Sequence, residues 1–219
     1  MADVLPLFPL SEVLFPGMLL PLHIFEPRYR LMIKRCLDEK IPFGVVLISA
    51  GTEVGPGADF FHVGTTARIK RVQRAEDGRL YIASIGEQRF RVLSTNQDQP
   101  YLQGSIEVIP EQPGEGARLD PLFDRAMDLL SRYLELITGS DQLRDNLKEK
   151  EFSPQALSYT IGTLLQVDRT EKQSILEIPA TSARLDHEVK MMEAELRQLK
   201  LLGQSQRQEA VAPPYWSLN

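Results

Sequence analysis

The sequence has little cysteine and no long apolar run. Cys36 is the only cysteine among 219 residues, so no internal disulfide can form, which fits a reducing compartment. No apolar stretch approaches the ~20 residues that a membrane span needs, and the opening MADVLPLFPL lacks the basic start of a secretory signal. We therefore expect a cytoplasmic protein with no disulfide framework and no membrane segment.

Signatures of catalytic and metal sites are also scarce. The chain has no Gly-Lys pair, and hence no Walker-type phosphate loop, and it has no Gly-x-Ser-x-Gly elbow. His23, His62 and His187 lie far apart and share no ligand-like spacing. Cys36 falls on the apolar face of a predicted helix, which is more typical of a core residue than of a nucleophile. The sequence thus predicts no catalytic residue, no metal and no cofactor.

The net charge of −5 is unevenly distributed. Residues 1–110 carry 12 basic and 12 acidic residues, whereas residues 111–219 carry 13 and 18. Clustered Lys and Arg would favour nucleic acid, and one such set exists: Arg68, Lys70, Arg71, Arg74, Arg79, Arg89 and Arg91. These residues alternate with apolar ones, so a solvated strand face is the simpler interpretation. The net charge argues against a nucleic-acid partner.

The first 110 residues carry the pattern of short strands. Five prolines within the first 27 residues exclude a long helix there. Residues 43–48 form an apolar run typical of a buried strand, and residues 63–70 alternate with period two. Asp77-Gly78 is typical of a hairpin turn, and Gly86 is predicted to separate the strand 80–85 from the strand 89–93. Six or seven such strands predict a small barrel or sandwich.

One helix interrupts these strands, and a charged corner precedes it. Apolar residues spaced by three and four predict a helix from Pro27 to about Asp38. Glu26 lies just before the first turn, where exposed N–H groups favour a carboxylate, and it could pair with Arg28 or Arg30. The simpler interpretation is a helix cap and an ion pair that hold the corner; a binding role is the alternative.

The second half has the 3.6-residue period of helices. Residues 111–118 have the composition of a linker, and Asp120 is predicted to cap a helix that ends near Gly139. Ser153-Pro154 and Asp168 with Glu171 predict two further helix starts. A last helix, with an apolar seam at Leu185, Val189, Met192, Leu196 and Leu199, is predicted to end at Gly203. We expect a helical subdomain over 119–203, then a flexible tail over 204–219. The seam packs within the chain or, alternatively, forms a dimer interface.

Several segments resemble one known family in order and spacing. They are LPLFPL at 5–10, VLFPG at 13–17, LPLHIFEPRYRLMI at 20–33, FGVVLI at 43–48, VGTTARI at 63–69 and LLQVDRTEKQSILEIPATSARL at 164–185. They resemble the N-terminal substrate-binding domain of the Lon protease family. This resemblance implies an α+β fold: a PUA-like β pseudo-barrel over 1–110 with one inserted helix, followed by a C-terminal helical bundle. Because the chain ends at Asn219, before the ATPase and Ser-Lys peptidase modules of that family, we expect a stand-alone domain.

The resulting hypothesis is a non-catalytic module that binds unfolded polypeptide or a protein partner, as a monomer or weak dimer. The proline-interrupted N-terminal region is too apolar to bury every face in one small barrel. Phe15, Met18, Phe25 and Tyr29 are the candidates for a partly exposed apolar groove, since methionine and aromatics suit adaptable binding; the alternative is that all four are core. An RNA-binding PUA-like protein that uses the basic strand set is the alternative function. A small enzyme at Glu26 and Arg28 has the least support.

Overall fold

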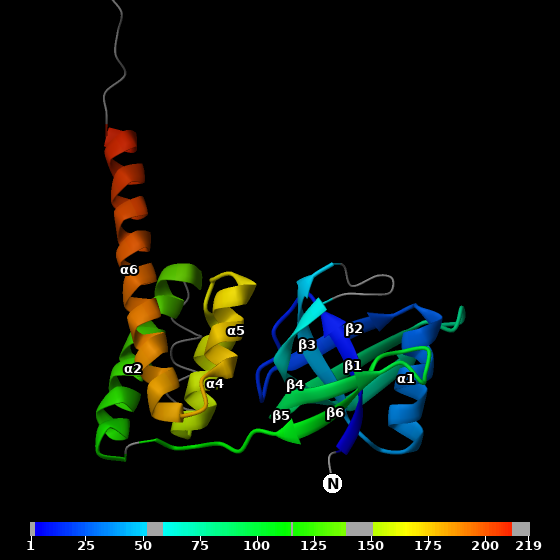
Figure 1. The fold of residues 1–219 in the computed structure, drawn as a ribbon. Coiled ribbons are helices and arrows are strands. Elements are labelled where there is room, and N and C mark those ends of the chain that lie inside the picture. The colour runs from blue at the N-terminus through cyan, green and yellow to red at the C-terminus, as the bar shows by residue number, and fades with distance from the viewer. Residues whose placement is uncertain (1–2, 52–58, 115, 139–150, 212–219) are drawn as a thin grey trace, which may run out of the picture.

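The chain forms two bodies that lie side by side (Figure 1), one with the strands and α1 and one with the later helices. The computed structural model describes residues 3–51, 59–114, 116–138 and 151–211. The strands are β1 (Asp3–Leu10), β2 (Leu19–Ile24), β3 (Phe43–Ala50), β4 (Asp59–Arg74), β5 (Leu80–Asn96) and β6 (Gln103–Val108). The helices are α1 (Pro27–Asp38), α2 (Gly116–Thr138), α4 (Pro154–Leu164), α5 (Arg169–Glu177) and α6 (Thr181–Val211). The predicted α+β fold, with one helix inserted among the strands and the others after them, is confirmed.

The six strands form one sheet in the order β2-β5-β4-β3-β1-β6. β1 and β3 are parallel, and the other neighbours are antiparallel. β5 is long enough to pair with β2 through its first half, where Leu19 faces Ile85, and with β6 through its second half, where Phe90 faces Val108. This double use of β5 curls the sheet into a pseudo-barrel. β2 pairs with β5 alone among the described strands, so its other edge is free of a strand partner.

Gly86 does not end a strand, and the prediction that it separates two strands is wrong. β5 runs through it without a break. A Cβ at Gly86 would lie 2.3 Å from the carbonyl oxygen of Phe15, so only glycine allows the turn before β2 to approach this closely. Gly17 N donates to Gly86 O at 2.9 Å, and Gly86 N donates to Met18 O at 3.0 Å. The glycine therefore docks this turn onto β5 and sets where β2 begins.

α1 begins and ends as the sequence predicts. Its apolar face, which includes Tyr29, Met32, Ile33 and Cys36, is buried in the core that the helix shares with β1 and β2. The aromatic rings of Phe8 and Tyr29 stack with centroids 4.0 Å apart. The helix thus packs against the inner face of the strands at the open side of the pseudo-barrel.

Two helix boundaries differ from the predicted ones. α2 begins at Gly116, so Asp120 is not its cap and Pro121 lies inside it; Leu119 packs on the helical core, which extends the apolar face towards the N-terminus. α6 continues to Val211, past Gly203, because one glycine costs a helix only about 1 kcal/mol and its neighbours are good helix formers. The predicted tail therefore begins as helix. Residues 139–150 and 212–219 lie outside the described residues.

The other helix signals are confirmed. Ser153 Oγ accepts from Ala156 N at the start of α4, and Asp168 accepts from Thr170 N and Glu171 N at the start of α5. Most of the α6 seam is buried against α2 and α4, which supports packing within the chain. Within the predicted linker, the carbonyl oxygens of Gln112 and Pro113 accept from Thr181 N and Ser182 N. This connection is thereby fastened to the start of α6.

We expect Gly86→Ala to destabilise the protein by about 1–3 kcal/mol, the usual cost of overpacking, because the new methyl group would meet the carbonyl oxygen of Phe15. Urea unfolding followed by circular dichroism measures this change. Gln88→Ala, at an exposed position of the same strand, is the control and should change stability by less than about 0.5 kcal/mol. Equal stability of both variants would show that the turn does not depend on the glycine.

Candidate functional site

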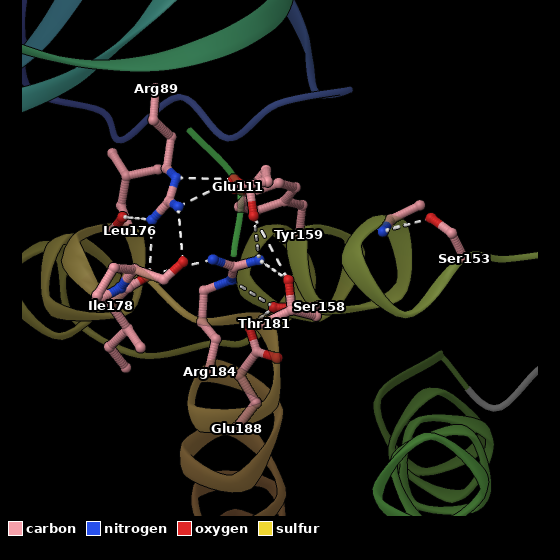
Figure 2. Close-up of polar contacts among 12 residues, drawn as sticks. Arg89, Glu111, Ser153, Ser158, Tyr159, Leu176, Ile178, Thr181, Arg184 and Glu188 are labelled. Carbon is pink, nitrogen blue, oxygen red and sulfur yellow. Dashed lines mark hydrogen bonds and ion pairs between the residues drawn. The ribbon is translucent and has the colours of Figure 1, made fainter. Parts of the chain in front are cut away.

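The densest group of buried charged side chains lies between the two bodies (Figure 2). Arg89 comes from β5, Glu111 from the segment after β6, and Arg184 from α6. Glu111 accepts from Arg89 Nε at 3.0 Å and from Arg184 Nη2 at 3.3 Å. Arg89 also donates to the carbonyl oxygens of Leu176 and Ile178, at 2.9 and 2.6 Å. One carboxylate therefore joins a strand arginine to a helix arginine, and the strand arginine caps the end of α5.

Further polar side chains extend this cluster into the helices. Arg184 Nε donates to Ser158 Oγ at 2.8 Å, and Ser158 Oγ donates to Glu188 at 3.1 Å. The hydroxyl of Tyr159 donates to Glu111, and the guanidinium of Arg184 lies 4.3 Å from the centre of the Tyr159 ring. Burial raises the pKa of Tyr159 and raises that of Glu188 well above its usual value of 4.5.

This cluster holds the fold together and is not accessible to a substrate. The side chains of Arg89 and Arg184 are 0% exposed, and burial lowers the pKa of Arg89. Arg89 was predicted to belong to a basic strand face, and for this residue the prediction is wrong. Its side chain points away from solvent, towards carbonyl oxygens that only the folded helices bring near it.

Other members of the basic set are neutralised in part by neighbouring carboxylates. Arg68 Nε lies 2.7 Å from Glu87, and Lys70 Nζ lies 3.9 Å from the same carboxylate. Arg79 Nε lies 2.6 Å from Asp77 across the hairpin turn. These pairs reduce the cationic field that an RNA-binding face would need.

An apolar pocket lies between β1, β2 and α1, where the sheet is open. Its volume is about 220 Å³. Phe8 and Leu10 of β1, Ile24 of β2 and Tyr29 of α1 form its floor, and none of the four is more than 6% exposed. The floor is built in part by the stacked rings of Phe8 and Tyr29. It offers an apolar surface to a ligand, half of it aromatic.

The rim of the pocket is exposed and more polar. Pro21, His23, Phe25 and Glu26 line it, and Phe25 is 51% exposed. The imidazole of His23 stacks on the ring of Tyr81 with centroids 4.6 Å apart and lies 5.7 Å from that of Phe25. An exposed phenylalanine beside an open apolar pocket is a feature that binding surfaces share.

Glu26, Arg28 and Arg30 hold the corner between β2 and α1. Glu26 occupies the N-cap position of α1 but makes no side-chain cap hydrogen bond; instead, it accepts from Arg28 Nε at 2.9 Å. The guanidinium of Arg28 lies 4.4 Å from the centre of the Tyr29 ring, and that of Arg30 lies against Gly78 in the hairpin turn. The predicted ion pair at this corner is thus present, and the predicted cap hydrogen bond is not.

The four predicted groove residues have different places. Phe25 and Tyr29 line the pocket, at its rim and its floor, whereas Met18 is half-buried between two cores. Phe15 is 0% exposed, so its assignment to an exposed groove is wrong. The docked turn directs its ring towards the helices, where Gly162 leaves room for it and Tyr159 lies 6.4 Å away.

Phe8, Leu10 and Tyr81 are site residues that sequence reasoning missed. They are ordinary strand residues in the pattern, and no local signal separates them from the rest of the core.

Cys36 is a core residue as predicted: it is buried, and burial raises the pKa of its thiol to about 12. Among the described residues no group of three or more His, Cys, Asp or Glu could hold a metal ion. Within the same residues, no helix is long and apolar enough to cross a membrane.

The architecture defines an α+β pseudo-barrel domain with a helical bundle behind it. The chain belongs to the family described as the ATP-dependent protease La (LON) substrate-binding domain, which it matches over residues 4–194. It is 28% identical to "Lon protease 2" of Syntrophobacter fumaroxidans over 208 residues and 29% identical to "Lon protease" of Anaeromyxobacter dehalogenans over 201 residues. These matches cover 91% and 90% of this chain, but only 25% and 24% of the relatives. The chain thus spans about a quarter of their length.

Two solved structures have the same fold. A Lon N-terminal domain protein from Xanthomonas campestris is 26% identical, with a TM-score of 0.65 over 84% of this chain and 96% of that one. The N-terminal domain of the Mycobacterium avium complex Lon protease is 18% identical, with a TM-score of 0.70 over 87% and 98%. The predicted family is therefore confirmed. The chain corresponds to the substrate-binding region of Lon proteases.

We expect Glu111→Ala to destabilise the protein by about 3–5 kcal/mol, the cost of leaving buried charges without their partner. Arg89 and Arg184 would both lose their only carboxylate contact among the described residues. Chemical unfolding measures the loss, and Glu107→Ala at an exposed position of β6 is the control. A loss no larger than that of the control would mean that the junction does not depend on this carboxylate.

Glu188 should make stability fall as pH rises. Its folded-state pKa is raised by burial, so the folded protein favours the neutral acid. That preference stabilises the fold below the usual value of 4.5 and is lost as pH rises through the higher folded-state value. Glu188→Gln keeps the hydrogen-bonding shape without ionising, so its stability relative to wild type should increase with pH. Urea unfolding at a series of pH values tests this, with Glu107→Gln as a control that keeps the wild-type slope.

Proposed function

We propose that this domain binds extended polypeptide and seats one large apolar side chain in the pocket between β1, β2 and α1. The observation that carries the proposal is Phe25, 51% exposed at the rim of a pocket with an aromatic floor. A volume of about 220 Å³ is below the ~300–1,000 Å³ typical of small-molecule sites. It suits a single side chain rather than a whole metabolite.

The neighbouring edge strand favours a polypeptide over other apolar ligands. Of the strands that the structure describes, β2 pairs with β5 alone, and an exposed strand edge is a common docking place for an extended chain. Pro21, exposed in the middle of β2, limits indiscriminate pairing because it lacks an N–H group. A bound segment would use the remaining main-chain groups of β2 and place alternate side chains towards the pocket.

The family supports the same function. Its description is that of a substrate-binding domain of a protease, and the substrates of a protease are polypeptides. We propose that the domain recognises unfolded segments through exposed apolar side chains and performs no bond cleavage itself. Its cytoplasmic location and its state as a monomer or weak dimer stay predictions from the sequence.

Replacing Phe25 with alanine should weaken peptide binding by about tenfold, because a buried aromatic contact contributes on the order of 1.5–3 kcal/mol. The measurement is fluorescence anisotropy of a labelled, otherwise polar peptide that contains one tryptophan. Folding should be unaffected, since the Phe25 side chain is half-exposed.

Leu93→Ala is the matched control for this experiment. Leu93 is 54% exposed on the second half of β5, which pairs with β6 and not with β2. If the wild-type protein binds the peptide and Phe25→Ala and Leu93→Ala lose affinity equally, the binding is nonspecific hydrophobic adsorption. No binding of the wild-type protein at concentrations up to about 100 µM, well above the range of useful weak recognition, would overturn the proposed function.

A further inference from the structure

A second, open groove lies on the outer face of β4 and β5. Its volume is about 510 Å³. Arg71, Val72 and Gln73 of β4 line it together with Tyr81, Ile82 and Ala83 of β5. Tyr81 is 45% exposed and shares its face of the sheet with Gln73 and Arg71, so the groove has an aromatic side chain next to a cationic one.

This groove continues from the apolar pocket. Gln73, Tyr81 and His23 stand in one row across the three adjacent strands β4, β5 and β2. The ring of His23, which lines the pocket, stacks at 4.6 Å on that of Tyr81, which lines the groove. The stacked pair therefore lies between the pocket and the groove. A bound peptide that leaves the pocket across β2 would enter the groove.

The far side of the groove is positively charged. Residues 68–87 include five basic and three acidic residues. Arg68, Lys70 and Arg79 each have a carboxylate within 4 Å. Arg71 and Arg74 are exposed and, within the described part of the chain, make no ion pair with a carboxylate. Of the two, only Arg71 lines the groove. Arg74 lies on the opposite face of the strand, with Val72, because successive side chains alternate along it. The guanidinium of Arg71 is thus available to a ligand in the groove.

We propose that the polypeptide held in the pocket crosses β2 and β5 into this groove, and that the domain prefers segments with a carboxylate near the apolar anchor. Neighbouring strands lie about 4.8 Å apart and an extended chain advances about 3.3 Å per residue. The step from the pocket beside β2 to Arg71 of β4 therefore takes about three to five residues. This inference rests on the proposed function and adds the charge of the preferred segment to it.

The apolar contacts favour a polypeptide over RNA as the occupant. The groove is joined by the stacked His23 and Tyr81 rings to a pocket of single-side-chain volume, and the basic residues nearest to Arg71 are partly neutralised by Glu87. The net charge of the chain is −5, which opposes a polyanion with one charge per nucleotide. A short segment with one or two carboxylates gains the local attraction without that long-range repulsion.

The test uses labelled peptides that each contain one tryptophan and differ at a single position about four residues away, occupied by Asp, Asn or Lys. Anisotropy titrations compare the wild-type chain, Arg71→Gln, Phe25→Ala, and the two controls Arg74→Gln and Arg91→Gln. Arg74 lies on the opposite face of β4. Arg91 is an exposed basic residue of β5, paired with β6 rather than β2.

We expect the Asp peptide to bind about two- to fivefold more tightly than the Asn peptide, as one exposed charge pair allows, and the Lys peptide to bind most weakly. Arg71→Gln should abolish this preference and retain binding of the Asn peptide, whereas Arg74→Gln should keep the preference. Arg91→Gln should keep it, and about 0.5 M salt should reduce it.

The outcomes separate this inference from the proposed function. If all three peptides bind equally and Phe25→Ala still weakens them, the pocket stands and the acidic preference is overturned. If no peptide binds, both are overturned. If an RNA oligonucleotide binds in a salt-dependent way that needs Arg71 and Arg74 while the peptides do not bind, the groove is a nucleic-acid surface and both proposals fail.

Discussion

The ion pairs of Glu111 with two buried arginines are the constraint on which the arrangement of the two bodies depends. Arg89 is a strand residue and Arg184 a helix residue, and both side chains are 0% exposed. A guanidinium removed from water needs charge and hydrogen bonds to replace its hydration. The carboxylate and the carbonyl oxygens at the end of α5 supply them only when barrel and helices are in contact. The hydrogen bonds and ion pairs therefore fix the orientation of the helices relative to the barrel.

This use of charge decides which surfaces are left for ligands. Two groups whose pKa burial raises, Glu188 and Tyr159, lie inside the junction. Glu188 accepts from Ser158 and Tyr159 donates to Glu111, and neither side chain is presented to solvent. The open side of the pseudo-barrel is different, because β2 has no second partner among the described strands. Apolar side chains therefore remain accessible there, beside the exposed Arg71 of β4. The position of the binding pocket follows from the way in which the sheet closes.

Local signals in the sequence predicted the elements whose causes are local. Pro27 at the start of α1, Asp77-Gly78 in the hairpin, and the caps at Ser153 and Asp168 act within a few residues, so their effect can be read from the chain. The errors concern residues whose role depends on distant neighbours. Gly86 was taken as a strand break because its contact with Phe15 is invisible in the pattern. For the same reason, Arg89 was placed on a solvated face and Phe15 in an exposed groove.

The amino-acid sequence alone determined the succession of strands and helices, the family, and two of the residues that line the pocket, Phe25 and Tyr29. Periodicity, capping and turn chemistry depend on residues close together in the sequence, and the family is identified by the order of motifs along the chain. Both can therefore be read without the tertiary structure. Only the tertiary structure decided which apolar and basic side chains reach solvent. It placed Phe8 of β1 beside Tyr29 and set Tyr81 of β5 against His23, while Arg89 was drawn into the junction. Exposure is a property of the whole packed chain, because a side chain is buried by residues that can lie anywhere else in the sequence.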